Sequence, residues 1–241
     1  MYYKKMIRVV DNFYDNPDEI VEQAKAAKYQ LISNGNYPGK DGLNRLYTTP
    51  ELERKLGKLF PGPRYKMICS RFRYALEGDT YMSYVHSDHW GIKSGWHVLI
   101  YLTKNASSKD GLTLYETKYG QRYWKEEAEE HTWDFPEWRP WKTHEYKYNQ
   151  AVIIDYCYFH APMNRGGFGK SFDDCRLLHI IEVIDTNSPA NKDRSFVKCV
   201  SMPEKHHPDG GDDDDQSSTW SDSEAASYER VEHLEHGIIV D

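Results

Sequence analysis

From residue 64 onward, the sequence consists of short β-prone runs separated by turn residues. Two of these runs, 151–155 and 177–181, are almost entirely apolar, which is typical of strands with neighbours on both sides. So many short strands after two helices favour a β-barrel or a pair of packed sheets buttressed by helices. The strands we expect cover about 5–10, 65–77, 81–88, 96–103, 111–117, 142–148, 150–155 and 175–184, with one more near 195–200.

Two helices are predicted ahead of the main run of strands. Asn16 is expected to cap the first helix, with Pro17 at the first helical position. Thr49 and Pro50 open a second helix in the same way. Between these helices, residues 33–45 are rich in glycine, asparagine and proline, and they predict a loop.

The chain is long enough for one domain with a substantial core. Residues 201–241 differ from the rest, because they hold 12 acidic and only two basic residues. A segment of low hydrophobicity and high charge cannot offset the entropy of ordering, so we expect a disordered acidic tail. The mainly β domain is expected in residues 1–200, with a helical buttress over about 12–62 and a β core over about 64–185.

Composition limits the partners of this domain. Outside the tail, 29 basic and 26 acidic residues nearly balance, so the domain has no strong electrostatic footprint for a nucleic-acid backbone. No signal-peptide core or membrane-spanning apolar run is present, and we expect a soluble cytoplasmic protein without membrane contact. The four cysteines form no CxxC pair and are expected to be buried thiols. Four of the seven tryptophans lie in the connection 118–141, which we expect to pack onto the helices rather than act as a substrate lid.

Two histidines and an aspartate are candidate metal ligands. His86 and Asp88 are two residues apart, so on a strand both side chains point to one face and can share an ion. His160 follows the apolar strand 151–155, and Arg176 begins the next strand, so the two can face one cavity if these strands are barrel neighbours. Two histidines and a carboxylate leave positions open on a metal, as non-haem Fe(II) requires. The planar fork of an arginine suits a carboxylate ligand.

A second His-x-Asp pattern, His207 to Asp209, lies in the acidic tail, whereas the first lies between β-prone runs and is therefore preferred. Three further histidines are not expected to be ligands. His89 falls on the wrong side of its strand, and His97 and His179 lie within strands as core or rim residues. His179 follows the candidate arginine by three residues, so the two should point to opposite faces.

Together these residues resemble the Fe(II)/2-oxoglutarate-dependent dioxygenases, and among them the prolyl-4-hydroxylase-like branch and its small members from phages and bacteria. The resemblance covers roughly residues 5–185 and depends on the order of several weak motifs. These are Ile7 to Phe13 with the following helix, Tyr74 to Gly78 with Tyr81, Trp96 to Thr103, Gly111 to Tyr115, and Asn149 to Ile154 before the distal histidine. Leu112 and Thr103 depart from the glycine and asparagine of the family pattern.

The resemblance implies a double-stranded β-helix, a jelly-roll or cupin-like core, that binds Fe(II) through His86, Asp88 and His160. The activity it implies consumes O2 and 2-oxoglutarate, and it yields succinate and CO2 while a C–H bond is hydroxylated. Ascorbate is expected as a reductant. The retained carboxylate of Asp88 favours hydroxylation, because related halogenases carry a small residue in its place.

For the co-substrate, the resemblance implies that Arg176 pairs with the distal carboxylate of 2-oxoglutarate. It also implies that Tyr101 donates a hydrogen bond to that carboxylate, and it makes Tyr74 a further cofactor-binding candidate. Arg165 is a rival to Arg176, because a glycine-rich insertion lengthens the distance from the distal histidine to 16 residues. We prefer Arg176, since a strand aims a side chain more rigidly than a loop does.

The primary substrate stays open, with a protein side chain or a small molecule favoured over a nucleobase. A nucleobase stays the alternative, because a local basic patch could contain Arg71, Arg73, Arg122 and Lys125. Two other classes fit the same residues. One is a non-catalytic, metal-dependent binding module that uses the tryptophan-rich connection, and the other is a cupin-type enzyme that uses the metal without 2-oxoglutarate.

Overall fold

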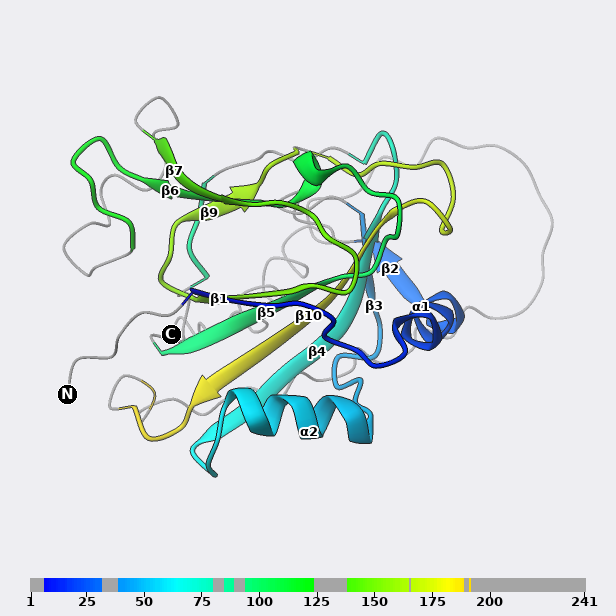
Figure 1. Ribbon diagram of the computed structural model, residues 1–241, viewed down its shortest axis with the longest axis horizontal. Helices are drawn as coiled ribbons and strands as arrows, with labels where there is room; N and C mark the ends of the chain where they lie inside the picture. The colour runs from blue at the N-terminus through cyan, green and yellow to red at the C-terminus, as the bar shows by residue number, and fades with distance from the viewer. Residues whose placement is uncertain are drawn as a thin grey trace, which may run out of the picture.

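The computed structural model describes residues 7–31, 39–79, 85–88, 94–123, 138–164, 166–188 and 191. Ten strands form two antiparallel sheets in this part of the chain (Figure 1). The strands are β1 (Ile7–Val10), β2 (Tyr29–Leu31), β3 (Lys40–Gly42), β4 (Tyr65–Ala75), β5 (Gly95–Tyr101), β6 (Leu112–Glu116), β7 (Arg139–His144), β8 (Ala151–Asp155), β9 (His160–Pro162) and β10 (Arg176–Asp185). The larger sheet has the order β1-β8-β5-β10-β4-β3-β2, and the smaller has the order β7-β6-β9.

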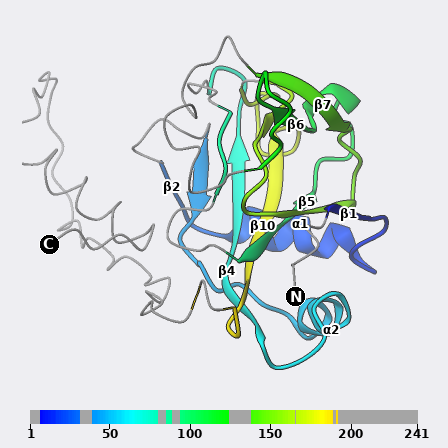
Figure 2. The ribbon, with the colours of Figure 1, turned by 90° about the vertical axis from the view of Figure 1, so that its left-hand side faces the viewer.

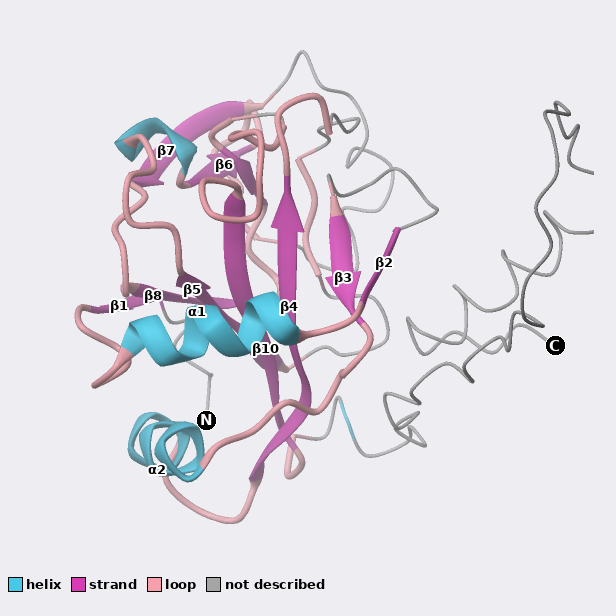
Figure 3. Ribbon diagram, turned by 90° about the vertical axis from the view of Figure 1, so that its right-hand side faces the viewer, coloured by secondary structure: helices cyan, strands magenta, loops and turns pink. Residues whose placement is uncertain are grey.

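Two α-helices, α1 (Pro17–Ala26) and α2 (Pro50–Leu59), begin at the predicted prolines. The hydroxyl of Thr49 caps α2 by accepting a 3.1 Å hydrogen bond from the N–H of Leu52, whereas Asn16 makes no side-chain cap bond. Figure 3 shows α1 lying across β4 and β10. A short 3₁₀ turn, η1 (Ser108–Asp110), follows β5. None of the described helices has the length and apolar character needed to cross a membrane.

The two faces of the larger sheet pack against different partners, because side chains alternate along each strand. Leu177 and Ile181 of β10 lie on the face that packs against Ile20 of α1 and Leu52 of α2. We call this the helix face. On the other face, residues of β5, β8 and β10 pack against Leu112 and Leu114 of the smaller sheet. We call that the inner face, and Figure 2 shows the smaller sheet at one end of the long strands β4 and β10.

The predicted mainly β core with N-terminal helices is confirmed, but one neighbour relationship was wrong. The strands β8 and β10 are not adjacent, because β5 lies between them and pairs with both. Both are still flanked on two sides, as their apolar sequences indicated, and both are fully buried at most positions.

Smaller differences concern local boundaries. Part of the predicted loop 33–45 is the strand β3, which pairs with β4 through Asp41 and Arg73. The strand predicted over 142–148 ends at His144. The possible strand at 195–200, the acidic tail and Cys199 lie outside the described residues. The other three cysteines, Cys69, Cys157 and Cys175, are buried as expected.

Candidate metal centre

The fold brings His86, Asp88 and His160 together. The backbones of His86 and His160 form an isolated antiparallel bridge, with N–H···O distances of 3.1 and 2.8 Å. Nε2 of His160 lies 3.1 Å from Oδ2 of Asp88, and Nε2 of His86 lies 3.6 Å from Oδ1 of the same carboxylate. One ligand atom from each residue lies within 4.8 Å of the other two. A single metal ion can therefore reach all three, which is the arrangement expected from the sequence.

The hydrogen bonding of His160 leaves its second ring nitrogen available for a metal. Nδ1 lies 2.9 Å from the carbonyl oxygen of Tyr158. A carbonyl can only accept, so Nδ1 carries a hydrogen, and Nε2 donates its own hydrogen to Asp88 when protonated and can bind a metal once that proton leaves. Metal-binding histidines in proteins commonly donate their other N–H to a backbone carbonyl in this way.

The electrostatics of this group favour a bound cation. Burial by itself lowers the pKa of His160, but the Asp88 carboxylate and the Tyr158 carbonyl outweigh burial and raise that pKa. Burial also opposes ionisation of Asp88, yet His97, His160 and His86 together hold its pKa well below the usual range. Asp88 is therefore a carboxylate that favours positive charge beside it, either a proton on Nε2 of His160 or a metal ion that replaces this proton.

Arg176 and Tyr101 lie on the inner face of the larger sheet, which also carries His97, the neighbour of Asp88. Tyr101 lies directly opposite Leu178 in the β5–β10 pairing, and Arg176 precedes Leu178 by two residues, so the three side chains share one face. Arg176 is 7% exposed and Tyr101 is 1% exposed. Within the described part of the chain, Nε of Arg176 and the hydroxyl of Tyr101 have no hydrogen-bond partner. Buried polar groups are rarely left unpaired, so both donors suit an acceptor that a ligand brings.

The environment of Tyr101 keeps its hydroxyl protonated. Burial raises the pKa of Tyr101, and the positive charge of Arg176 only partly opposes this effect. The Tyr101 ring stacks on Tyr146 with centroids 4.2 Å apart. The Tyr146 hydroxyl donates to the carbonyl of Leu177 at 2.9 Å, and it lies 3.0 Å from the hydroxyl of Thr103. This contact chain fixes the phenol of Tyr101 beside the start of β10.

Sequence reasoning missed the polar residues that surround Asp88. Nδ1 of His97 lies 3.2 Å from Oδ2 of Asp88, and Nε2 of His97 lies 4.0 Å from Glu182. Glu182 accepts a 2.7 Å hydrogen bond from Arg71. Strand alternation could have located two of these residues, because His97 precedes Tyr101 by four positions and Glu182 follows Arg176 by six.

Tyr74, expected beside 2-oxoglutarate, lies elsewhere. It pairs directly with Leu177 and packs against Tyr29 and Phe172, with ring centroids 4.8 and 5.0 Å away. These contacts belong to the helix face, opposite to Arg176, because neighbouring residues of a strand point in opposite directions. His179 also lies on the helix face, as predicted. The rival arginine Arg165 and the histidine His89 lie outside the described residues.

The proposed basic patch is not formed by Arg71 and Arg73. Both are buried, and both donate to Asp41, with Nε–O distances of 3.1 and 2.5 Å. Burial opposes the charge on Asp41, but the neighbouring arginines hold its pKa well below the usual range. The exposed Arg122 lies over the Trp141 ring at 4.4 Å, and Lys125 lies outside the described residues.

The tryptophans of the connection 118–141 do not pack onto the helices where they are described. Trp138 packs on Phe159, with ring centroids 4.7 Å apart, and Trp141 lies 6.2 Å from Tyr158. These contacts are with the smaller sheet and the turn before it, so the expectation of a helical contact was wrong for Trp138 and Trp141. Trp124 and Trp133 lie outside the described residues.

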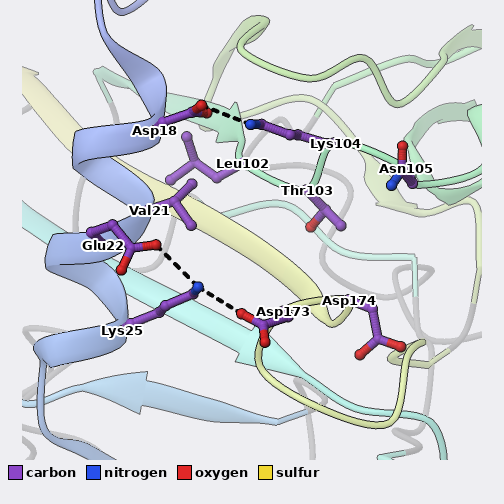
Figure 4. A pocket seen from close by; sticks show the side chains of 10 residues that line it. All are labelled: Asp18, Val21, Glu22, Lys25, Leu102, Thr103, Lys104, Asn105, Asp173 and Asp174. Carbon is purple, nitrogen blue, oxygen red and sulfur yellow. Dashed lines mark hydrogen bonds and ion pairs between the residues drawn. The ribbon is translucent and has the colours of Figure 1, made fainter.

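A separate cleft lies between α1 and the loops around 102–105 and 173–174 (Figure 4). Its charged side chains pair with one another across the opening. Lys104 lies 2.7 Å from Asp18, and Lys25 lies 2.6 Å from Asp173. The cleft contains none of the candidate metal ligands, and its ion pairs contrast with the unpaired donors of Arg176 and Tyr101.

No family sequence model matches this chain, and no curated protein is significantly similar to it in sequence. Solved structures nevertheless share its fold. The epimerase SnoN in complex with Fe3+, α-ketoglutarate (2-oxoglutarate) and nogalamycin RO is 12% identical, with a TM-score of 0.53 over 91% of this chain and 93% of SnoN. HygX from Streptomyces hygroscopicus, with nickel, 2-oxoglutarate and hygromycin B bound, is 11% identical, with a TM-score of 0.48 over 76% of this chain and 84% of HygX.

A prolyl hydroxylase from Trichoplax adhaerens, in complex with a hypoxia-inducible-factor peptide, is 11% identical, with a TM-score of 0.46 over 76% of this chain and 84% of that enzyme. It is one of several kinds of oxygenase with this architecture, so the narrower prolyl-hydroxylase-like branch stays a prediction. At such low identity these matches establish the fold alone. The chain has the double-stranded β-helix fold seen in 2-oxoglutarate-dependent oxygenase structures.

Proposed function

We propose that this chain is an Fe(II)- and 2-oxoglutarate-dependent oxygenase, with His86, Asp88 and His160 as the metal ligands. The observation that carries this proposal is the pair of buried, unpaired donors, Arg176 and Tyr101, on the inner face, where His97 contacts Asp88 of this group. A purely structural metal site gives a buried arginine no acceptor. A dicarboxylate co-substrate gives it one and brings a second carboxylate toward the metal.

The residues of the site fit both Fe(II) and 2-oxoglutarate. Two imidazoles and one carboxylate are the ligand set of non-haem Fe(II) oxygenases, which keep positions open for a co-substrate and O2. Arg176 would hold the distal carboxylate of 2-oxoglutarate through its planar fork, and Tyr101 would donate a further hydrogen bond. When bound together, Fe(II), 2-oxoglutarate and O2 supply the oxidation of a C–H bond, with succinate and CO2 as co-products. The likeness to SnoN, solved with Fe3+ and the same co-substrate, supports this assignment.

We propose hydroxylation as the outcome, on a protein side chain or a small molecule. The buried pairing of Arg71 and Arg73 with Asp41 weighs against a nucleic-acid substrate, because these arginines cannot contact phosphates without leaving a buried carboxylate unpaired. The oxygenated product would be found by untargeted mass spectrometry as a mass gain of one oxygen atom.

The first test is co-substrate turnover. Wild-type protein with Fe(II), 2-oxoglutarate, O2 and ascorbate should produce succinate above the rate of a metal-free control. Arg176→Met should weaken 2-oxoglutarate binding by about 10- to 100-fold, since a hydrogen bond to a charged group is worth about 1.5–3 kcal/mol. Calorimetric titration of Mn(II)-loaded protein measures this change. Metal affinity should stay at its wild-type value, because Arg176 is not a ligand.

Two variants make the test specific. Arg176→Lys keeps the charge but not the planar fork, so its affinity should fall between wild type and Arg176→Met. Tyr101→Phe removes only the hydroxyl and should weaken binding less than Arg176→Met does. Full metal occupancy without 2-oxoglutarate binding would instead indicate a metal-dependent binding module. Unchanged substrate oxidation by Arg176→Met would indicate a cupin-type enzyme.

A further inference from the structure

A histidine outside the ligand set contacts the carboxylate that would hold the metal. Nδ1 of His97 lies 3.2 Å from Oδ2 of Asp88, on the inner face of β5. His97 does not belong to the group of described residues whose ligand atoms lie close enough to share one ion. His97 can therefore affect metal binding only indirectly, through Asp88.

The chemistry of the two atoms decides which of them can carry a hydrogen across this 3.2 Å contact. An ionised carboxylate can only accept, so the contact is attractive when Nδ1 of His97 carries the hydrogen and points it at Oδ2 of Asp88. The backbone N–H of Asp88 is held separately, by a 2.8 Å bond to the carbonyl of Tyr156. Backbone and carboxylate of Asp88 are thus held by different partners, and Oδ2 faces both Nδ1 of His97 and Nε2 of His160, which is 3.1 Å away.

The His97 ring is itself held in place. Tyr156 packs edge-to-face against it, with centroids 4.7 Å apart and an interplanar angle of 88°. Tyr156 can approach because position 95 is glycine: a Cβ there would lie 2.3 Å from Cε2 of the tyrosine ring. On its other side, Nε2 of His97 faces Glu182 at 4.0 Å, and Arg71 anchors Glu182 at 2.7 Å.

We propose that His97 is a positioning residue, which holds Oδ2 of Asp88 so that the carboxylate offers the metal one oxygen rather than two. This inference deepens the proposed function and rests on it. A carboxylate that binds through both oxygens occupies an extra coordination position. A co-substrate that takes two positions and O2 that takes one need three open positions, so a single carboxylate oxygen is the arrangement that leaves room for both.

The test compares variants that keep or remove a donor at the place of Nδ1, with Co(II) alone as the probe. His97→Phe keeps a ring but no donor, and it should weaken Co(II) binding by about 10- to 100-fold, the range found when a partner of a metal ligand is removed. It should also change the visible d–d absorption of bound Co(II). His97→Asn places its amide nitrogen near the position of Nδ1, so it should stay within about threefold of wild type and keep the spectrum.

The matched control is His179→Phe, which removes a buried histidine of the same sheet on the helix face. It should lower thermal stability and leave the Co(II) affinity and spectrum of the folded protein unchanged. Should His97→Phe not fold, His97→Gln takes its place, because its amide reaches the position of Nε2 rather than that of Nδ1. His97→Gln should then lose affinity where His97→Asn does not.

The outcomes separate this inference from the proposed function. Wild-type Co(II) affinity and spectrum in His97→Phe, or equal losses in the asparagine and glutamine variants, overturn the positioning role while the proposed function stands. A loss of Co(II) affinity restricted to the variants without a donor at the place of Nδ1 supports the positioning role. This holds even if 2-oxoglutarate does not bind, in which case only the oxygenase proposal fails. A wild-type protein that binds no Co(II) overturns both.

Discussion

Two histidines on neighbouring strands show how differently one sheet uses the same side chain. His179 of β10 is fully buried on the helix face, and both ring nitrogens meet neutral hydroxyls: Tyr14 at 2.7 Å and Ser70 at 2.8 Å. His97 of β5 lies on the inner face, where its nitrogens face the carboxylates of Asp88 and Glu182. The first histidine completes a core, whereas the second adjoins a group of charges.

The two faces also differ in which of their buried polar groups have hydrogen-bond partners. On the helix face, the hydrogen bonds of His179 are complete within the chain, and burial lowers its pKa to about 3, so it stays neutral. At the candidate site, Nε2 of His160 lies 3.1 Å from the Asp88 carboxylate, and on the inner face the buried donors of Arg176 and Tyr101 lack acceptors within the described residues. The indole N–H of Trp96 on the helix face is also unpaired, so the difference between the faces lies in the buried charge of Arg176, which needs an acceptor more than a neutral group does.

The largest expected effect comes from removing a metal ligand on the inner face. His160→Ala should lower metal affinity by well over 100-fold, because the loss of a ligand exceeds the ~10- to 100-fold cost of losing a ligand's partner. The thermal stability of the metal-free protein should fall as well, because the interaction of the protonated His160 with Asp88 is lost, so the affinity is measured on folded protein. Competition titration with a coloured chelator measures the affinity. Near wild-type affinity would mean that the metal binds elsewhere.

The helix face should respond in the opposite way. His179→Phe removes the partner of two buried hydroxyls, and each unsatisfied group costs about 1–3 kcal/mol, so the free energy of unfolding should fall by about 3 kcal/mol. Metal affinity of the folded protein should not change. Urea denaturation of the metal-free protein measures the loss. An equal loss of metal affinity would mean that the two faces are coupled and do not have separate roles.

The stability of the helix face should also depend on pH through His179. Its pKa is about 3 in the folded protein, against 6.5 as the ordinary value, so below pH 6.5 the unfolded chain binds a proton that the folded protein does not. The stabilisation by a neutral His179 is therefore complete above pH 6.5 and declines by about 1.4 kcal/mol per pH unit as the pH falls toward 3. The difference in unfolding free energy between wild type and His179→Phe should shrink along this range. A difference that stays constant from pH 7.5 to pH 4.5 would contradict it.

Local chemistry explains which parts of this arrangement the sequence could predict. The helix starts at Pro17 and Pro50, and the alternation that points His179 away from Arg176, depend on a few adjacent residues. The order of the strands does not. Nothing near β8 or β10 specifies that β5 lies between them, because strand order is decided by packing among segments far apart in the chain.

The same distinction applies to the candidate site. The grouping of the candidate ligands His86, Asp88 and His160 was predicted from their spacing and context, whereas the contact of His97 with Asp88 depends on how the segment 85–88 lies against β5. The pairing of Asp41 could not be predicted from the sequence for another reason. Its segment has the composition of a loop, yet it forms a strand between β4 and the edge strand β2, where a buried carboxylate pairs with Arg71 and Arg73. Composition predicts local conformation and does not report such pairing.

The smallest expected effect comes from Gly95, where the backbone of β5 supports the inner face. In Gly95→Ala the new Cβ would lie 2.3 Å from the Tyr156 ring and 2.7 Å from the carbonyl oxygen of Val183, so the ring must move. Such overpacking costs about 1–3 kcal/mol, which thermal denaturation would detect. Because Tyr156 packs on His97, metal affinity should fall too, by less than in His97→Phe. Gly57→Ala is the matched control, since a Cβ there meets nothing within 4 Å. A stability loss in Gly95→Ala without any change in metal affinity would show that His97 keeps its place without Tyr156, because the carboxylates of Asp88 and Glu182 suffice to hold the ring.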